Sequence, residues 1–466
     1  MTILRRSKIL ITLGPATEDP KVLEAVLKAG ADAVRINFSH GDSAQHLRYL
    51  RLVRQTARRL NRPCAVLADL MGPKIRVDKQ TYSLEPDAVV TLVKGAGDPA
   101  RNKVGLTHAG WFPRAKIGQR ILLDDGKLEL EFRGLSKGGA KAAVMRGGLL
   151  KPGKSLNVPG VNLGLPVPTL KDQEDLKVIA KAGFDWIAAS FMSRAEDVRK
   201  IREFCDSIDL HIPIIAKIEN AEAVENLRGI VEEADGVMVA RGDLGVELEL
   251  ERIPTIQRNV IHLARELGKV TLVATQMLET MMESPLPTRA EVTDVSTAAL
   301  ARVDSLMLSG ETAAGKYPVE TVSMMDRTIR MTERNLEEEI ISVPHSEPIA
   351  LTCEAGLYLG LIAGAKALIA VTTQGSTPRI LATYRGKIPI VVACTRESIY
   401  NRSTLYYSVY PLLVEPVTET EAVFRKIEIE LKARDLVKKG DVVVFVFGFP
   451  IHGKNRTNTI RRWEVG

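Results

Sequence analysis

The chain has 466 residues, of which 45% are hydrophobic, with a formal net charge of +7. This size and composition predict a globular protein of two to four domains, and no apolar run reaches the ~18 residues that a membrane helix needs. The positive charge fits nucleic acid and phosphorylated metabolites alike. Only 5% of the residues are aromatic and no basic–aromatic platform is visible, so we expect no nucleic-acid binding.

The N-terminal sequence and the cysteines indicate the cellular compartment that we expect for the chain. The N-terminus has basic residues before an apolar run, but that run is short and continues into Gly14-Pro15, so we interpret it as a strand rather than a secretion signal. The four cysteines, Cys64, Cys205, Cys353 and Cys394, have neither metal-ligand nor disulfide spacing. We therefore expect thiols in a reducing cytoplasm.

Short apolar runs that end in polar residues recur along the chain, and helical patterns separate them. The runs are Lys8–Leu13, Ala33–Phe38, Ala65–Ala68, Trp186–Phe191, Pro213–Ile218, Gly236–Ala240, Val270–Ala274 and Ser305–Leu308. Pro20 marks the start of the first helix, and capping boxes are predicted at Thr169–Asp172, Ser193–Glu196 and Thr288–Glu291. Strand–helix units in this number predict a (β/α)₈ TIM barrel, whose active site lies at the carboxyl ends of the strands.

The third run is followed by no helix. Residues 73–165 instead contain short alternating runs and frequent glycine, which predict an all-β insertion. The insertion leaves the barrel at the rim expected to hold the active site, so we predict that it acts as a lid. We assign residues 1–72 and 166–344 to the barrel, 73–165 to the all-β lid domain, and 345–466 to a C-terminal α/β domain.

The stretch from Pro213 to Glu249 carries the densest chemistry. Lys217 and Glu219 are two residues apart, so they share one face of a strand, and Gly242 and Asp243 follow the end of the next strand. A lysine and two carboxylates at neighbouring strand ends can hold a divalent cation and bind a phosphate beside it. A buried salt bridge plus a turn is the alternative.

Other predicted strand ends add polar residues to the same rim. They are Arg35, Asn37, Ser39, Asp69, Thr275, Ser309 and Glu311. In the C-terminal domain, a loop between a strand and a helix is rich in hydroxyls, with the sequence Thr372, Thr373, Gln374, Gly375, Ser376 and Thr377. Hydroxyls and a glycine at a helix N-terminus suit a phosphate group, with an ordinary N-cap turn as the alternative.

Seven segments together carry a resemblance to a known family. They are VRINFSHG, ADLMGPKIR, KIEN, VMVARGDLGVE, ATQMLETM, PTRAEVTDV and MLSGETAAGKYP. In this order the chain resembles pyruvate kinases over its whole length, lid and C-terminal domain included. The resemblance implies transfer of phosphoryl from phosphoenolpyruvate to ADP, giving pyruvate and ATP in the last step of glycolysis.

The resemblance also implies roles for the rim residues. Glu219 and Asp243 would ligate Mg²⁺ or Mn²⁺. Lys217 and Arg35 would neutralise the negative charge of the phosphoryl group during its transfer. The substrate carboxylate would lie against backbone N–H groups near Gly242 and Asp243, at the start of a short helix. Thr275 would help to protonate the enolate carbon through water, since a threonine hydroxyl alone is a poor acid. The remaining roles go to His40, Arg76 and Asn37 on the ADP side, and to Ser309 and Glu311 on the proton-delivery side.

Two departures from the family pattern change these expectations. Many members bind K⁺ through positions matching Asn37, Ser39, Asp69 and the Leu70 carbonyl, with a glutamate where this chain has Lys74. The fixed ammonium can replace the field of the ion, so we expect that K⁺ is not required; a surface lysine without a role is the alternative. A nucleotide-contacting lysine of the family is replaced by Pro159, and Lys154 is a substitute candidate.

The family resemblance also implies a sugar-phosphate effector at the Thr372–Thr377 loop, with contacts from the basic segment His452–Arg456, and a homotetramer. Two other functions stay open at this stage. One is a Mg²⁺-dependent 2-oxo-acid lyase or aldolase on a related barrel. The other is a phosphate-sensing or nucleic-acid-binding protein without turnover. ATP formation from phosphoenolpyruvate and ADP discriminates among the three.

Overall fold

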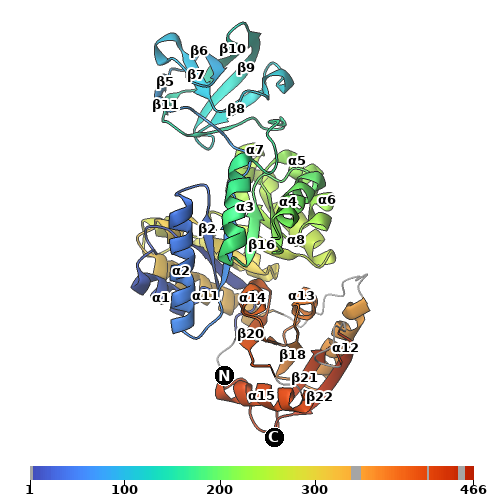
Figure 1. The fold of residues 1–466 in the computed structure, drawn as a ribbon. Coiled ribbons are helices and arrows are strands. Elements are labelled where there is room, and N and C mark those ends of the chain that lie inside the picture. Colours follow the sequence, from blue (N-terminus) through green and yellow to red (C-terminus); the bar gives the residue numbers. More distant parts are fainter. Residues whose placement is uncertain (1–3, 337–347, 417–418, 450–456) are drawn as a thin grey trace.

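The computed structural model describes residues 4–336, 348–416, 419–449 and 457–466. Eight parallel strands form a closed barrel in the order β1-β17-β16-β15-β14-β13-β3-β2 (Figure 1). Their bounds are β1 Lys8–Thr12, β2 Ala33–Asn37, β3 Ala65–Asp69, β13 Trp186–Ala189, β14 Ile214–Ile218, β15 Gly236–Ala240, β16 Val270–Ala274 and β17 Ser305–Leu308. The predicted TIM barrel is confirmed.

Helices surround these strands. They are α1 Pro20–Ala29, α2 Ser43–Arg59, α3 Leu170–Ala182, α4 Ala195–Ser207, α5 Ala221–Glu225, α6 Leu227–Glu233, α8 Ile253–Glu266, α9 Arg289–Leu300 and α11 Pro318–Arg334. Two short helices, α7 Arg241–Glu247, which the family resemblance implies, and α10 Gly310–Ala313, which we did not predict, begin at the carboxyl ends of β15 and β17. They place backbone N–H groups at the barrel rim.

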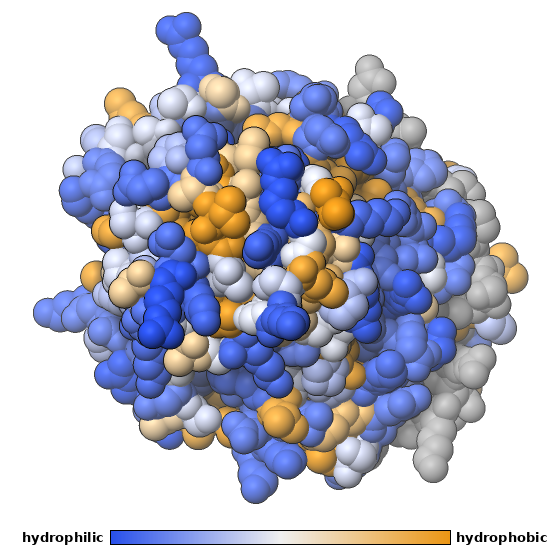
Figure 2. Space-filling view, turned by 90° about the horizontal axis from the view of Figure 1, so that it is seen from above, coloured by the Kyte–Doolittle hydropathy of each residue, from blue (hydrophilic) through white to orange (hydrophobic). Residues whose placement is uncertain are grey.

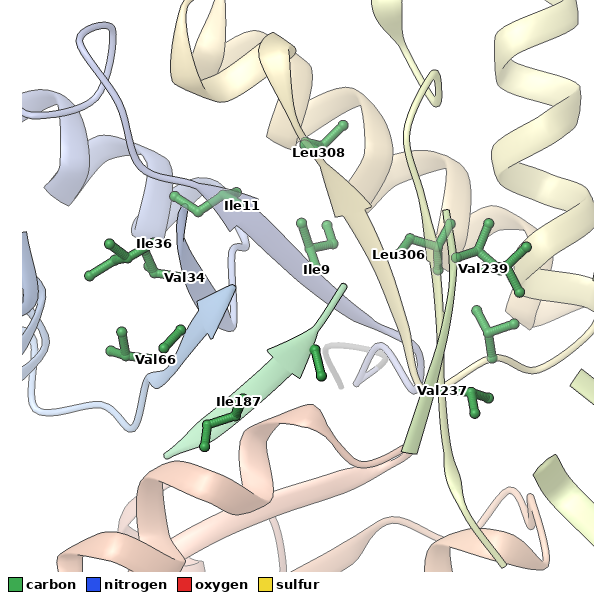
Figure 3. Packing of buried hydrophobic residues seen from close by; sticks show 14 of the residues in the cluster. Ile9, Ile11, Val34, Ile36, Val66, Ile187, Val237, Val239, Leu306 and Leu308 are labelled. Carbon is green, nitrogen blue, oxygen red and sulfur yellow. The ribbon is translucent and has the colours of Figure 1, made fainter. Parts of the chain in front are cut away.

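Alternation along the barrel strands divides the core into two layers. Ile9 and Ile11 of β1 pack outward with Val34, Ile36 and other strand residues against the surrounding helices (Figure 3). Leu10, between them, belongs to a second cluster that fills the barrel interior. The strands are therefore buried on both faces, which explains their nearly continuous apolar runs.

The helix starts follow the predicted capping boxes in two cases and differ in the third. Thr169 and Thr288 each accept a hydrogen bond from the third helical residue, whose carboxylate accepts one in return. The predicted box at Ser193–Glu196 is wrong. Helix α4 starts one residue later, because the Asp197 carboxylate accepts from the Ser193 and Arg194 amides, both at 3.0 Å.

The chain between β3 and α3 forms the all-β lid, at one end of the barrel (Figure 1). A seven-stranded sheet has the order β4-β12-β8-β9-β10-β6-β7, and β11 pairs with β5. The strands are β4 Ile75–Arg76, β5 Tyr82–Leu84, β6 Val89–Lys94, β7 Lys103–Leu106, β8 Arg120–Leu123, β9 Leu128–Ser136, β10 Gly139–Arg146, β11 Gly148–Leu150 and β12 Ser155–Asn157. Figure 2, viewed from the lid end, shows small hydrophobic areas separated by hydrophilic surface.

A second α/β unit lies at the opposite end of the barrel from the lid (Figure 1). Its five-stranded sheet has the order β20-β19-β18-β21-β22, with β22 antiparallel. The elements are α12 Pro348–Ile362, β18 Ala367–Val371, α13 Ser376–Thr383, β19 Ile390–Cys394, α14 Glu397–Arg402, β20 Val409–Leu413, α15 Thr420–Ala433, β21 Val442–Phe447 and β22 Thr459–Glu464. We did not predict α14, β20 or β22.

A buried ion pair joins this unit to the barrel base. Both terminal nitrogens of Arg385 lie at 2.5–2.6 Å from the Asp304 carboxylate, at the start of β17. All four cysteines are free and buried, as expected. In the described part of the chain, no helix combines the length and apolar character needed to cross a bilayer.

Candidate active site

The carboxyl ends of the barrel strands surround a cavity of about 340 Å³. Side chains from β1, β2, β14, β15, β16 and β17 reach it, as the strand-end rule predicts. Of the predicted site residues, the lining includes Arg35, Asn37, His40, Lys217, Asp243, Thr275 and Ser309.

Lys217 is held in place by three oxygen-bearing groups. Its ammonium donates to Ser190 Oγ at 2.8 Å and lies 2.9 Å from Glu219 Oε1 and 3.2 Å from Asp69 Oδ1. Burial alone would lower the pKa of Lys217, but the Asp69 and Glu219 carboxylates outweigh burial and raise this pKa. Lys217 is therefore a permanent, fixed positive charge at the cavity wall.

Arg35 supplies a second fixed cation. Its Nε donates to Asp69 Oδ2 at 2.6 Å, and a terminal nitrogen donates to Thr12 Oγ1 at 3.1 Å. Burial would raise the pKa of Asp69, yet Lys217 and Arg35 more than compensate and hold this pKa below its ordinary value. Asp69 thus acts as the shared anchor of both cations rather than as an acid.

Glu219 lies behind Lys217 and does not line the cavity itself. The side chain is fully buried, and its second carboxylate oxygen accepts from the Phe191 amide at 2.6 Å. Burial raises the pKa of Glu219; Lys217 opposes this shift, while Asp243 adds to it. Burial is the main cause of this rise, and the charge of Asp243 adds to it, so a further positive charge beside the two carboxylates would lower this pKa.

Helix α7 places Asp243 in the cavity wall, and Gly242 beside it is bound to Thr275. The Gly242 amide donates to Thr275 Oγ1 at 2.7 Å, and the Thr275 hydroxyl donates to the Ala274 carbonyl at 2.6 Å. The left-handed backbone of Thr275 (φ 70°) directs this side chain back to α7. Both hydrogen-bonding roles of the hydroxyl are therefore engaged.

Arg241 fixes the start of α7 through contacts with Asp294 and the Thr275 carbonyl. One terminal nitrogen lies 2.7 Å from both carboxylate oxygens of Asp294, and the other donates to the Thr275 carbonyl at 2.7 Å. No role was predicted for Arg241 or Asp294 from the sequence. The strand end at Ser190 was also overlooked, although it follows β13 and the strand-end rule could have found it.

The side of the site next to the lid is rich in positive charge. Lys74 Nζ lies 3.7 Å from Asp243 Oδ1 and 4.9 Å from the centre of the Phe191 ring. Burial, followed by the charges of Arg76, Arg35 and Lys74, lowers the pKa of His40. Arg76 does not line the cavity; its guanidinium donates to the Gly153 carbonyl at 2.9 Å.

The remaining predicted rim residues have mainly local contacts. Asn37 Oδ1 accepts from the Ser39 amide at 3.0 Å, and the Leu70 carbonyl accepts from Ser190 Oγ at 2.8 Å. Glu311 is buried and accepts from the Ser309 and Leu278 amides at 2.7 and 3.2 Å, so its carboxylate holds the loop and does not line the cavity. Lys154 pairs within the lid with Asp124 at 2.7 Å.

The hydroxyl-rich loop of the C-terminal unit forms the start of α13. Thr372 Oγ1 accepts from the Gly375 and Gln374 amides at 2.9 and 3.3 Å, and Thr377 Oγ1 lies 2.6 Å from Thr457 Oγ1. Thr373 and Gln374 are exposed, and Ser376 is half-buried. Of the predicted basic segment, His452–Arg456, all residues lie outside the described residues.

Comparison with known proteins gives matches along nearly the whole chain. Residues 4–322 match the family model described as pyruvate kinase, barrel domain, and residues 351–461 match that described as pyruvate kinase, alpha/beta domain. A protein of Geobacillus stearothermophilus named pyruvate kinase is 39% identical over 475 residues, covering 98% of this chain and 80% of the relative. One of Mycobacterium intracellulare with the same name is 37% identical over 469 residues, covering 99% of both.

Proposed function

This chain belongs to the pyruvate kinase family, and we propose that it transfers the phosphoryl group of phosphoenolpyruvate to ADP, giving pyruvate and ATP. One observation carries the proposal: a single cavity gathers two anchored cations, Lys217 and Arg35, beside the carboxylate of Asp243. Phosphoryl transfer depends on such positioned charge, because its transition state spreads negative charge over the phosphoryl oxygens.

The residues present fit a divalent cation. Glu219 and Asp243 offer hard carboxylate oxygens, and their mutual repulsion would be relieved by added positive charge. No group of three His, Cys, Asp or Glu side chains suited to a metal occurs in the described part of the chain. Substrate and water oxygens would complete the shell, as is common for Mg²⁺. When bound, Mg²⁺ or Mn²⁺ neutralises charge on the oxygens of the phosphoryl group and of the substrate.

The chain's own residues then divide the chemistry. Lys217 and Arg35 approach the phosphoryl group from two strands and stabilise its charge in flight. We assign the substrate carboxylate to the amides of Gly242 and Asp243 at the start of α7, where the Gly242 amide would exchange its hydrogen bond to Thr275 Oγ1 for one to the substrate. Thr275 orients α7 and faces the enolate carbon. Its hydroxyl proton is already donated to the Ala274 carbonyl, so we assign delivery of the proton to water held by Thr275, with Ser309 on the same wall.

The nucleotide would enter from the lid side. His40, Asn37 and Arg76 are our candidates for the ADP phosphates, since the positive charges of Arg76, Arg35 and Lys74 all act on His40. In this structure Arg76 contacts the Gly153 carbonyl and Lys154 contacts Asp124. Both side chains would exchange these partners for phosphate oxygens when the nucleotide binds.

We further propose that catalysis does not require K⁺. The Lys74 ammonium, 3.7 Å from Asp243, brings a permanent positive charge to the edge of the site. The carboxylate of Asp69, which is one of the candidate K⁺ ligands, is already paired with Lys217 and Arg35. Assays with K⁺ replaced by tetramethylammonium test this proposal, and a strong dependence on K⁺ would refute it.

A sugar-phosphate effector at the Thr372–Thr377 loop is also part of the proposal. The loop joins β18 to α13, and its exposed residues Thr373 and Gln374 leave it accessible. We propose in addition a cytoplasmic homotetramer, as is usual in the family. Two side chains of α12, Leu351 and Ile362, are 73% and 86% exposed in the single chain, which an assembly would cover. Sedimentation of the purified chain measures the oligomeric state.

A coupled assay tests the proposed reaction. The purified chain is supplied with phosphoenolpyruvate, ADP and Mg²⁺, and pyruvate and ATP are measured separately. Equal amounts of both, with none when ADP is omitted, are expected. In a parallel assay with 2-oxo-acid adducts in place of phosphoenolpyruvate, release of pyruvate without ATP would instead indicate the lyase or aldolase alternative.

A further inference from the structure

Helix α7 links the catalytic cavity to the lid. Its first turn carries Asp243 in the cavity wall, and its last residue, Glu247, accepts a hydrogen bond from Asn157 Nδ2 of the lid at 3.2 Å. Because the helix is a short rigid element, a displacement of Glu247 is transmitted to Asp243 one turn away.

On the lid side, this contact lies close in the sheet to Arg76, one of the candidate residues for binding the ADP phosphates. Asn157 is the last residue of β12, and the preceding residues of that strand pair with β4, with Ser155 opposite Arg76. The contact between Glu247 and Asn157 therefore joins the segment that carries Asp243 to the strand that carries Arg76.

The environment of Glu247 distinguishes its hydrogen bond with Asn157 from a solvent-exposed surface contact. Burial raises the pKa of the carboxyl, and hydrogen bonds from Asn157 and the Gly160 backbone stabilise the charged form. Glu247 and Asn157 also line a crevice of about 100 Å³ between the lid and the barrel. Hydrogen bonds from the lid therefore offset part of the cost of burying this half-buried carboxylate.

We propose that Glu247 is a positioning residue, which sets the place of the lid strand bearing Arg76 relative to Asp243 through its hydrogen bond with Asn157. Glu247 contacts no reacting atom; it acts on the nucleotide side of the reaction through the lid. The proposal rests on the proposed function, because it assigns the affected step to ADP binding.

An exchange of donor and acceptor tests the contact. The Asn157→Asp variant places a second carboxylate against that of Glu247, so the hydrogen bond to this charged group is lost. We therefore expect the KM for ADP to rise about tenfold. The KM for phosphoenolpyruvate should change far less. Adding Glu247→Gln to Asn157→Asp supplies an amide donor opposite the new carboxylate, and should restore the KM for ADP.

A matched control lies in the same lid segment. Asn162 Nδ2 donates to Glu222 Oε2 at 3.4 Å at an exposed position, and Glu222 is also bound by Arg194. Asn162→Asp makes the same chemical change, but the arginine and solvent screen the new charge. We expect the KM for ADP of this variant to stay within about twofold of wild type.

Hydrogen exchange of the β4 and β12 amides gives a readout besides activity. Asn157→Asp should accelerate exchange in both strands, and the double variant should reverse it. An unchanged KM for ADP in Asn157→Asp, or no rescue in the double variant, would overturn the proposal. Absence of ATP formation by the wild-type chain would instead refute the proposed function, and the exchange data would still test the contact.

Discussion

Replacement of Lys217 by methionine tests the electrostatic core of the site. Methionine keeps the length and the apolar stem of the side chain but removes the ammonium that lies 2.9 Å from Glu219 and 3.2 Å from Asp69. Removing one preorganised donor from a transition state costs about 10²–10³ in kcat, and a largely buried charge at the cavity wall belongs at the upper end of this range. We therefore expect a loss of about 10³-fold in kcat.

The same substitution should affect stability less than catalysis. Breaking a buried ion pair costs about 3–5 kcal/mol when a charge is left unpaired. Here Asp69 keeps Arg35 at 2.6 Å, and Glu219 keeps the Phe191 amide at 2.6 Å. We expect a cost of about 3 kcal/mol, which corresponds to a fall in Tm of about 6–12 °C for a domain of this size.

Affinity for the metal separates the two possible roles of Lys217. Loss of the ammonium leaves Glu219 and Asp243 with more negative potential, so Mn²⁺ titrated into Lys217→Met and followed by electron paramagnetic resonance should bind at least as tightly as in wild type. Ser190→Ala, which removes only the 2.8 Å hydrogen bond of the ammonium, serves as the control and should lose about fivefold in kcat. Recovery of wild-type kcat at high Mg²⁺ would refute the reasoning, since Lys217 would then only hold the metal ligands in place.

Three further predictions concern other parts of the chain. Lys74→Glu should lower activity in tetramethylammonium and make it recover on addition of K⁺; activity of this variant that ignores K⁺ would count against the proposed replacement. Thr372→Ala combined with Ser376→Ala should abolish activation by sugar phosphates and leave basal turnover intact, and an unchanged response would contradict the effector assignment. Burial lowers the pKa of Lys8, below the Tyr410 ring, to about 8 from 10.5 in the unfolded chain. The folded state then binds the proton more weakly than the unfolded chain does, so the free energy of unfolding of wild type should rise relative to that of Lys8→Met by up to about 3 kcal/mol as the pH rises from 8 to 10.5. Denaturant unfolding measures this difference, and a difference that stays constant with pH would refute the prediction.

The positions of the catalytic residues were predictable because, in a (β/α)₈ barrel, the carboxyl ends of all strands lie at the same rim. Each buried strand reads as an apolar run, and the polar residues at or just after its carboxyl end must lie near the rim. Lys217, Asp243 and Thr275 were located in this way, and the structure brings all three to one cavity. Glu219 followed the same rule but lies behind Lys217, because its carboxylate is bound by the Phe191 amide.

Other contacts depend on residues far apart in the sequence, which no local pattern reveals. Arg241 is bound by Asp294, 53 positions later, and Glu247 by Asn157, 90 positions earlier. The short helix α7, which carries Arg241 and Glu247, was expected only from the family resemblance, because a helix of two turns leaves little periodic signal. The prediction of a capping box at Ser193 failed for a related reason: Asp197 competes for the same amides.

The location of a bound divalent cation tests the account most directly. Crystals grown with Mn²⁺ and a non-hydrolysable analogue of phosphoenolpyruvate would show the ion by anomalous scattering. We expect its density between the carboxylates of Glu219 and Asp243, at about 2.0–2.3 Å from one oxygen of each, with the Lys217 ammonium against the analogue. An ion bound elsewhere, or Lys217 turned away from the analogue, would contradict the account.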